Sequence, residues 1–295
     1  MFCPIICYFF GWRKLNLMKK IYFFTLAASL ITLAVQAQEN RTASYSLFNP
    51  VPRAALRDME TDRPDMTESP ITIDAGHFQY ESDLFRLQRE ANEGSVKNTY
   101  LFNQANLKVG LTGSTALQLV VQSYASSKEI STGDGSVERS RGFGDLTLRI
   151  KQNLIGNDKG NFAIALLPYV KFPTSRVEEQ ERYEGGLILP MSLKLPGDWK
   201  LGMQLEADRL QDSEGGAMHT QLLETLTLAH KLCNHLDGIA ETYYTYDTKI
   251  HHWNNYLNAA LQLELAKDFK VDGGLNYGLQ HDAMKSYFVG LSFRL

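Results

Sequence analysis

The stretch FKVDGGLNYGLQ, residues 269–280, alternates between two kinds of side chain at every step. One row is apolar apart from a glycine: Phe269, Val271, Gly273, Leu275, Tyr277 and Leu279. The row between them is polar or glycine: Lys270, Asp272, Gly274, Asn276, Gly278 and Gln280. Because successive side chains of a strand point to opposite faces, this period of two predicts a β-strand with one apolar and one polar face. The pattern returns in YFVGLSFRL, residues 287–295, so two such strands end the chain.

The same alternation recurs upstream and predicts twelve strands in all. Their expected ranges are 77–87, 96–107, 115–125, 142–154, 161–172, 183–195, 199–208, 217–232, 236–246, 253–265, 269–280 and 287–295. Alternating segments of about ten residues, even in number and separated by turns, are typical of bacterial outer-membrane barrels. The predicted fold is therefore all-β, a transmembrane antiparallel up-and-down β-barrel of about 12 strands over residues 76–295.

The connections between these strands also alternate in kind. Tight turns such as 112–114 and 196–198 follow every second strand, and the others are generally longer and more polar, with 126–141 the longest. Short periplasmic turns and longer outer loops are the expected asymmetry of an outer-membrane barrel with both termini in the periplasm. The alternative is a water-soluble β-sandwich or barrel, but its strands would typically be shorter, near five or six residues.

The start of the chain carries a secretory signal. Lys19 and Lys20 form its positive region, residues 21–33 its apolar region, and Val35-Gln36-Ala37 its cleavage motif. We interpret residues 1–17 as a mis-annotated extension before a true start at Met18, residues 18–37 as the signal peptide, and Gln38 as the mature start. The alternative is an N-terminal membrane helix, but the apolar run is short for a span.

Charge and cysteine content narrow the partners of the mature chain. Loss of the four positive residues Arg13, Lys14, Lys19 and Lys20 takes the formal net charge from −3 to −7, which disfavours nucleic acid. Cys233 is then the single remaining cysteine, so it forms no internal disulfide and has no companions at zinc spacing. We expect outer-membrane lipid and a small-molecule solute as partners, and no cofactor.

Residues 38–75 form a leader that shows no strand alternation. Pro50, Pro52, Pro64 and Pro70 block a continuous strand or helix, and residues 60–70 read ETDRPDMTESP. One interpretation is a solvated periplasmic linker. The other is a plug tucked into the barrel mouth, in which the charged residues pair with the wall. The candidate plug residues are Asp62, Arg63, Pro64, Asp65 and Glu68.

This motif, followed by GHFQYE at residues 76–81, resembles an outer-membrane transporter family labelled "putative MetA-pathway of phenol degradation". The pattern Thr-Asp-Arg-Pro-Asp-x-Thr-Glu-Ser-Pro and then Gly-His-x-Gln is typical of its Bacteroidetes-type members, and the resemblance covers residues 60–295. It implies a barrel in a Gram-negative outer membrane that passes small molecules. It does not establish phenol as the substrate, because the family's name comes from gene neighbourhood, and it implies no catalytic residues.

The polar rows of the strands would face the barrel interior. The candidate lumen-lining residues are Arg149, Lys151, Glu206, Asp208, Glu241, Glu264, Asp272 and Arg294. Both signs of charge are present, so they are either solvated wall residues paired across the lumen or a constriction that selects solutes. Because eight strands leave a filled interior and sixteen an open channel, twelve predict a narrow pore or one plugged by the leader.

Enzyme chemistry has little support in the sequence. No His-x-Ser pair occurs that would match the catalytic pair of an outer-membrane phospholipase. His251 and His252 are adjacent in a loop, where metal binding is conceivable but solvated histidines are the commoner case. We therefore expect no enzyme activity and predict a barrel for the passage of small, apolar or aromatic solutes. The alternatives are a surface or structural barrel whose outer loops bind a partner and, third, a lipid-modifying enzyme.

Overall fold

The computed structural model describes residues 45–92, 94–177, 181–212 and 216–295. The predicted extension 1–17, the signal peptide 18–37 and the first part of the leader lie outside these residues. The described chain contains one short 3-10 turn, η1 (Arg53–Ala55), and thirteen strands. They are β1 (Phe78–Ala91), β2 (Ser95–Gly110), β3 (Thr115–Ser131), β4 (Val137–Gly142), β5 (Leu146–Ile155), β6 (Phe162–Phe172), β7 (Glu184–Leu195), β8 (Trp199–Gln211), β9 (Met218–Cys233), β10 (Leu236–Asp247), β11 (His252–Ala266), β12 (Phe269–Gly278) and β13 (Lys285–Arg294).

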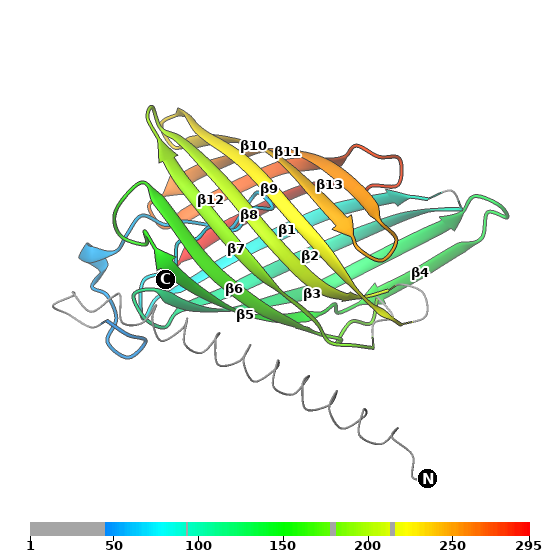
Figure 1. The fold of residues 1–295 in the computed structure, drawn as a ribbon, viewed down its shortest axis with the longest axis horizontal. Coiled ribbons are helices and arrows are strands. Elements are labelled where there is room, and N and C mark those ends of the chain that lie inside the picture. Colours follow the sequence, from blue (N-terminus) through cyan, green and yellow to red (C-terminus); the bar gives the residue numbers. More distant parts are fainter. Residues whose placement is uncertain (1–44, 93, 178–180, 213–215) are drawn as a thin grey trace, which may run out of the picture. The chain divides into compact units, whose positions relative to one another are not determined.

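The strands close into one antiparallel barrel (Figure 1). Consecutive strands pair with each other except at β4, where β5 pairs with β3 instead. β1 pairs with both β2 and β13, which joins the two ends of the sheet. Twelve strands form the closed wall and β4 is an extra short strand on β3, so the predicted twelve-stranded barrel is confirmed. No helix in the described part of the chain is long and apolar enough to cross a membrane.

The region around β4 corrects one predicted loop. Residues 126–141 were expected to be irregular, but β3 continues to Ser131 and β4 pairs with it from Val137 to Gly142. Residues 143–145 follow β4, and the chain then continues as β5, which pairs with residues 115–121 of β3. This hairpin extension is polar on both faces and so lacks the alternation that marks a lipid-facing strand. Its backbone can still satisfy its hydrogen bonds by pairing.

The two faces of the wall have opposite chemistry. Outward positions carry exposed leucines such as Leu205, Leu257 and Leu261. Inward positions are polar and buried, for example Gln118 and Gln204, each only 1% exposed. An apolar exterior around a polar interior is the arrangement of a membrane barrel, because hydrocarbon surrounds its outside.

The ends of the barrel differ. At the end that we call the turn end, the connections are 111–114, 156–161, 196–198, 234–235 and 267–268. At the loop end they are 92–94, 132–136, 173–183, 212–217, 248–251 and 279–284. The last of these folds inward, where Ala283 and Met284 pack on Leu223, Tyr243 and Tyr256. The interior near the loop end therefore has an apolar and aromatic wall.

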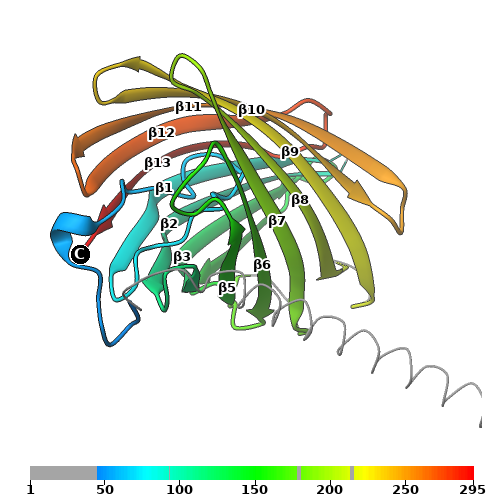
Figure 2. The ribbon, with the colours of Figure 1, turned by 60° about the vertical axis from the view of Figure 1, so that its left-hand side comes forward.

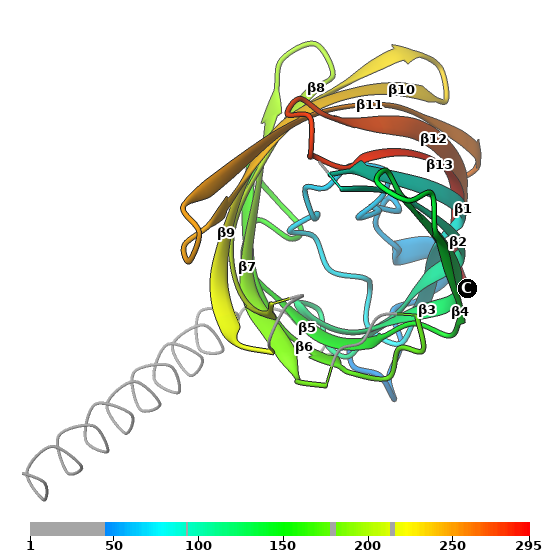
Figure 3. The ribbon, with the colours of Figure 1, turned by 90° about the vertical axis from the view of Figure 1, so that its right-hand side faces the viewer.

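The described part of the leader, residues 45–75, enters the barrel at the turn end and lies within the ring of strands (Figures 2 and 3). Backbone bridges join Ser46 to Thr112 and Ala75 to Gly110. The His77 ring then contacts the backbone oxygens of Val51 at 2.7 Å and Leu295 at 3.0 Å, so it links the leader to the chain's C-terminus.

Candidate functional site

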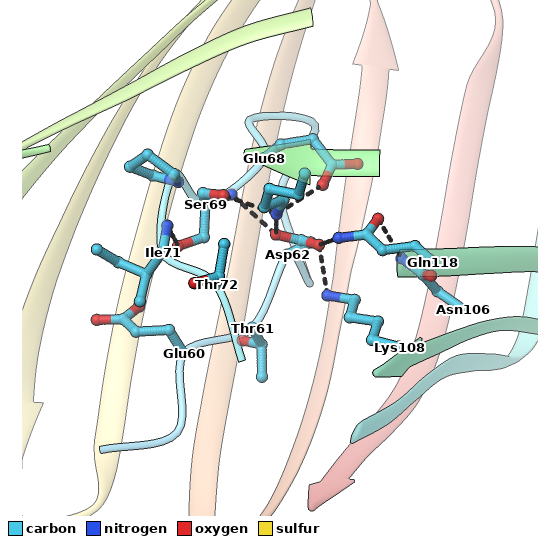
Figure 4. Close-up of polar contacts among 12 residues, drawn as sticks. Glu60, Thr61, Asp62, Glu68, Ser69, Ile71, Thr72, Asn106, Lys108 and Gln118 are labelled. Atoms are coloured by element: carbon cyan, nitrogen blue, oxygen red, sulfur yellow. Dashed lines mark hydrogen bonds and ion pairs between the residues drawn. The ribbon is translucent and has the colours of Figure 1, made fainter. Parts of the chain in front are cut away.

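Asp62 is the centre of the contacts between the leader and one wall of the barrel (Figure 4). Its carboxylate accepts hydrogen bonds from the ammonium groups of Lys108 on β2 and Lys151 on β5, the latter at 2.5 Å. The backbone N–H of Ser69 donates to the same carboxylate at 3.0 Å, so Asp62 also closes the leader on itself. The two lysines lower the pKa of Asp62 well below its usual value, although burial opposes them.

Glu81 on β1 completes this buried ionic cluster. It accepts from Lys108 and from the backbone N–H groups of Asp62 and Arg63 at 3.0 and 3.2 Å. Lys151 also donates to the carbonyl of Ser69 at 2.7 Å. Glu81 and Lys151 are each 1% exposed. Buried charges are tolerated only when they are paired and hydrogen-bonded, and here each has at least two partners, most of them across the contact between the leader and the wall.

Arg63 reaches another part of the wall. Its guanidinium binds Asp83 on β1 and Asp272 on β12, with one contact to Asp272 at 3.2 Å. Its carbon Cζ lies 5.8 Å from the centroid of the Phe288 ring. A Cβ atom at Gly290 would lie 2.1 Å from the Arg63 guanidinium, so a glycine on β13 leaves the room that this side chain occupies.

Thr67 and Glu241 form a second anchor on β9 and β10. Glu241 accepts from the backbone N–H groups of Met66 at 2.8 Å and Thr67 at 2.9 Å, and from the Thr67 hydroxyl at 2.6 Å. Thr227 and Asn258 each donate to it at 2.8 Å. Five donors therefore converge on the carboxylate of a residue that is only 4% exposed, so this buried group has its hydrogen-bond partners in place.

Further contacts hold the remaining parts of the leader. Glu68 binds Arg149 on β5, and Glu60 accepts from Lys200 on β8 at 2.6 Å. On the return path, the Asn153 amide donates to the carbonyl of Pro70 at 2.8 Å. Near the turn end, Asp74 pairs with Arg57 at 2.7 Å and with Arg294 at 3.3 Å. Leader contacts thus reach β1, β2, β5, β8, β9, β10, β12 and β13, which means that the leader crosses the lumen.

The residues selected from the sequence fall into two groups. Arg149, Lys151, Glu241, Asp272 and Arg294 all contact the leader. Glu206 and Asp208 instead bind their own wall, at Gln204 and Tyr169, and Glu264 lies half-buried opposite Lys270. Pro64 is buried in the leader. Other wall partners of the leader were not predicted, because a polar residue in an inward row looks like any other wall residue. They are Glu81, Asp83, Lys108, Thr225 and Thr227.

Asp65 lies at a cavity inside the barrel. With Glu60, Lys200 and Asp237 it lines this cavity, of about 180 Å³, between the leader and the wall. Burial raises the pKa of Asp65 well above its usual value, and the neighbouring Glu241 carboxylate raises it further. The docked leader therefore holds a proton at Asp65 more tightly than a released leader would.

Replacing Asp65 with asparagine is expected to tighten leader docking at neutral pH. Protonated Asp65 favours docking at a pH below the ordinary carboxyl pKa. This contribution to the free energy of docking is lost as pH rises through the raised pKa of the docked state, whereas asparagine stays neutral at every pH. The measurement is the ratio of wild-type to Asp65→Asn cleavage rates within residues 60–70, which cancels the pH dependence of the protease itself. The ratio should rise about tenfold or more from acid to neutral pH, since one pKa unit is a factor of ten. A ratio that does not vary with pH would refute this.

No group of three or more metal-binding side chains that could hold an ion occurs among the residues that the structure describes. The loop histidines have ordinary partners. His251 contacts the Tyr246 hydroxyl at 2.8 Å, and His252 lies 3.2 Å from both Asn254 and Asp282.

A closed antiparallel barrel with an apolar exterior and a polar interior defines this chain as an outer-membrane β-barrel protein. The chain belongs to the family described as "Putative MetA-pathway of phenol degradation", whose sequence pattern matches residues 61–295. The resemblance seen in the leader motif is thereby confirmed.

Solved structures are similar to this chain, and one of them has a TM-score above 0.5. An outer membrane channel from Pseudomonas putida F1 aligns with a TM-score of 0.55 at 12% identity, covering 80% of this chain and 100% of that one. The NanC porin aligns with a TM-score of 0.47 at 12% identity, over 73% and 100% of the two chains. The translocator domain of the autotransporter NalP from Neisseria meningitidis also has a TM-score of 0.47 at 12% identity, over 74% and 88%. A comparison with curated protein sequences found no significant match.

Proposed function

We propose that this protein is an outer-membrane channel for small solutes in which the leader, described from residue 45 to 75, acts as a plug. The observation that carries the proposal is the span of the leader across the lumen. Asp62 is bound to Lys108 and Lys151 on one side, and Thr67 to Glu241 on another. A segment anchored on several walls stands in the path of any solute that passes along the barrel axis.

The proposed orientation places the turn end in the periplasm. The described leader begins there at Tyr45, and Leu295 donates to the carbonyl of Phe78 at the same end. Short periplasmic turns and longer outer loops are usual in such barrels. The predicted signal peptide, residues 18–37, would deliver the chain across the inner membrane before the barrel inserts.

The proposed solutes are small and apolar or aromatic. The wall near the loop end is built around aromatic rings, with the Tyr243 and Tyr256 centroids 4.4 Å apart and Phe288 on a neighbouring part of the wall, all three buried. Aromatic side chains bind flat apolar molecules through their faces and edges. The family description points to aromatic degradation, which agrees with this class of solute without naming one.

The test is single-channel conductance in a planar bilayer, for the mature chain and for a version that lacks residues 38–70. We expect the truncated protein to conduct in large, steady steps and the intact protein to stay closed or to conduct in brief openings. Equal steady conductance by both would mean that the leader is not a plug. Conductance by neither would contradict the channel and would favour a barrel that binds a partner through its loops.

A further inference from the structure

Glu224 interrupts an apolar row on the outside of the barrel. Its side chain is exposed and lies between Leu222 and Leu226 in the outward row of β9, near the middle of that strand. Other outward charged residues, such as Arg89 and Lys285, lie close to the loop end instead. Within the described part of the chain, the Glu224 side chain has no hydrogen bond or ion pair to another residue. An unpaired carboxylate that faces hydrocarbon is unfavourable and marks a candidate site.

Glu224 is one of the residues that line a groove of about 520 Å³ on the outer surface. Leucines of β6, β7 and β8 line one side of it, among them Leu187 and Leu205. Rings of β10 and β11 line the other side: Tyr244, Tyr246 and Trp253. Glu224 is directly opposite Leu205 on β8 and Tyr244 on β10, so it lies between the two sides. The size is within the range of small-molecule sites.

We propose that this groove binds an amphiphilic organic cation, an ammonium group on an alkyl or aryl body, that enters from the membrane. The ammonium would pair with Glu224 and contact the faces of the neighbouring rings, an arrangement that favours cations. Tyr246 and Trp253, with centroids 4.3 Å apart, form one such aromatic wall. The apolar body would lie along the leucines. Its transfer from lipid to these side chains would cost little free energy, because both surroundings are apolar.

Other occupants fit the groove less well. An anion would be repelled by Glu224, and a neutral lipid chain would leave the carboxylate unpaired in hydrocarbon. A second copy of the chain in the same membrane would be related by an axis along the membrane normal, so that residues of equal depth meet. At this depth the second copy would present leucines and its own Glu224. It would therefore supply no positive charge to pair with the Glu224 carboxylate of the first copy.

The experiment measures quenching of Trp253 fluorescence by a spin-labelled fatty amine, compared with the fatty alcohol of the same chain, in nonionic detergent. A Trp199→Phe background removes the other described tryptophan, and a Trp253→Phe variant measures the residual signal. We expect the amine to quench at a concentration about tenfold lower than the alcohol does. In Glu224→Gln this preference should disappear while quenching by the alcohol is unchanged. Asp134→Asn, a change in the exposed loop 132–136, is the matched control and should keep the preference.

Two outcomes would overturn the proposal. One is an equal response to amine and alcohol in the wild-type groove, or a preference that survives Glu224→Gln. The other is a change of oligomeric state in Glu224→Gln, measured by light scattering, without any change in amine quenching, which would identify an interface between copies. Heat-modifiable migration in electrophoresis shows that each variant has formed its barrel, so a lost preference cannot be mistaken for misfolding.

Discussion

Replacing Asp62 with leucine is expected to release the leader from the lumen. The substitution leaves the ammonium groups of Lys108 and Lys151 buried without the carboxylate that binds both. Breaking a buried ion pair by removing one partner costs about 3–5 kcal/mol, because the remaining charge is uncompensated. The ratio of docked to released leader should therefore fall by about a hundredfold or more, since each 1.4 kcal/mol is a factor of ten. The measurements are protease cleavage within residues 60–70 and single-channel conductance, both of which should rise.

The matched control for this variant is Asp58→Asn, which neutralises an exposed carboxylate of the same leader. It removes one negative charge without unpairing Lys108 or Lys151, so cleavage and conductance should match those of the wild type. Retention of heat-modifiable migration by Asp62→Leu would show that the wall assembled. An assembled Asp62→Leu barrel with a leader as protected as that of the wild type would mean that this cluster does not hold the leader.

Replacing Glu241 with leucine is expected to have an effect of similar size at the second anchor. The variant would leave the backbone N–H groups of Met66 and Thr67 without their acceptor, whereas the Thr67 hydroxyl keeps its contacts with Thr225 and Thr227. An unsatisfied buried donor costs about 1–3 kcal/mol, so the docked leader should lose several kcal/mol in total. The readout is hydrogen exchange at Met66 and Thr67, which should accelerate by a hundredfold or more.

Thr225→Val is the control for the second anchor. It removes one contact, the 2.6 Å hydrogen bond to Thr67, and leaves Glu241 with all its donors. We expect a change of about 1 kcal/mol, the net value of a single hydrogen bond.

The double variant Asp62→Leu and Glu241→Leu should release the leader little further than either single change, because both anchors hold one segment and their effects are not additive. Equal protection of Met66 in Glu241→Leu and the wild type would show that this carboxylate is dispensable.

The barrel wall was predictable because its cause is local. Lipid on one side and a polar interior on the other require a change of polarity at each residue, as in Leu201-Gly202-Met203-Gln204 on β8. The prediction was wrong for 126–141, where the strand pair of β3 and β4 is polar on both faces. Backbone hydrogen bonds between the two strands stabilise this region. Its sequence lacks the apolar–polar alternation that was used to predict the other strands.

The leader was only partly predictable. Its prolines excluded a strand, and its charged motif favoured either a plug or a solvated linker, with no means of choosing between them. The choice depends on whether partners stand at the right depth on the wall. The structure provides them at Lys108, Glu81 and Asp83, three inward residues that the sequence does not distinguish from solvated neighbours.

By itself, the sequence determined the all-β class, the twelve strands and the face that each strand turns to lipid, because these follow from a period of two along the chain. Only the tertiary structure decided which charges meet. Asp62 and Lys108 are 46 residues apart, and Arg63 and Asp272 are 209 apart. Such pairs form only after the barrel closes with a particular stagger and the leader turns inward, and no local pattern encodes either event.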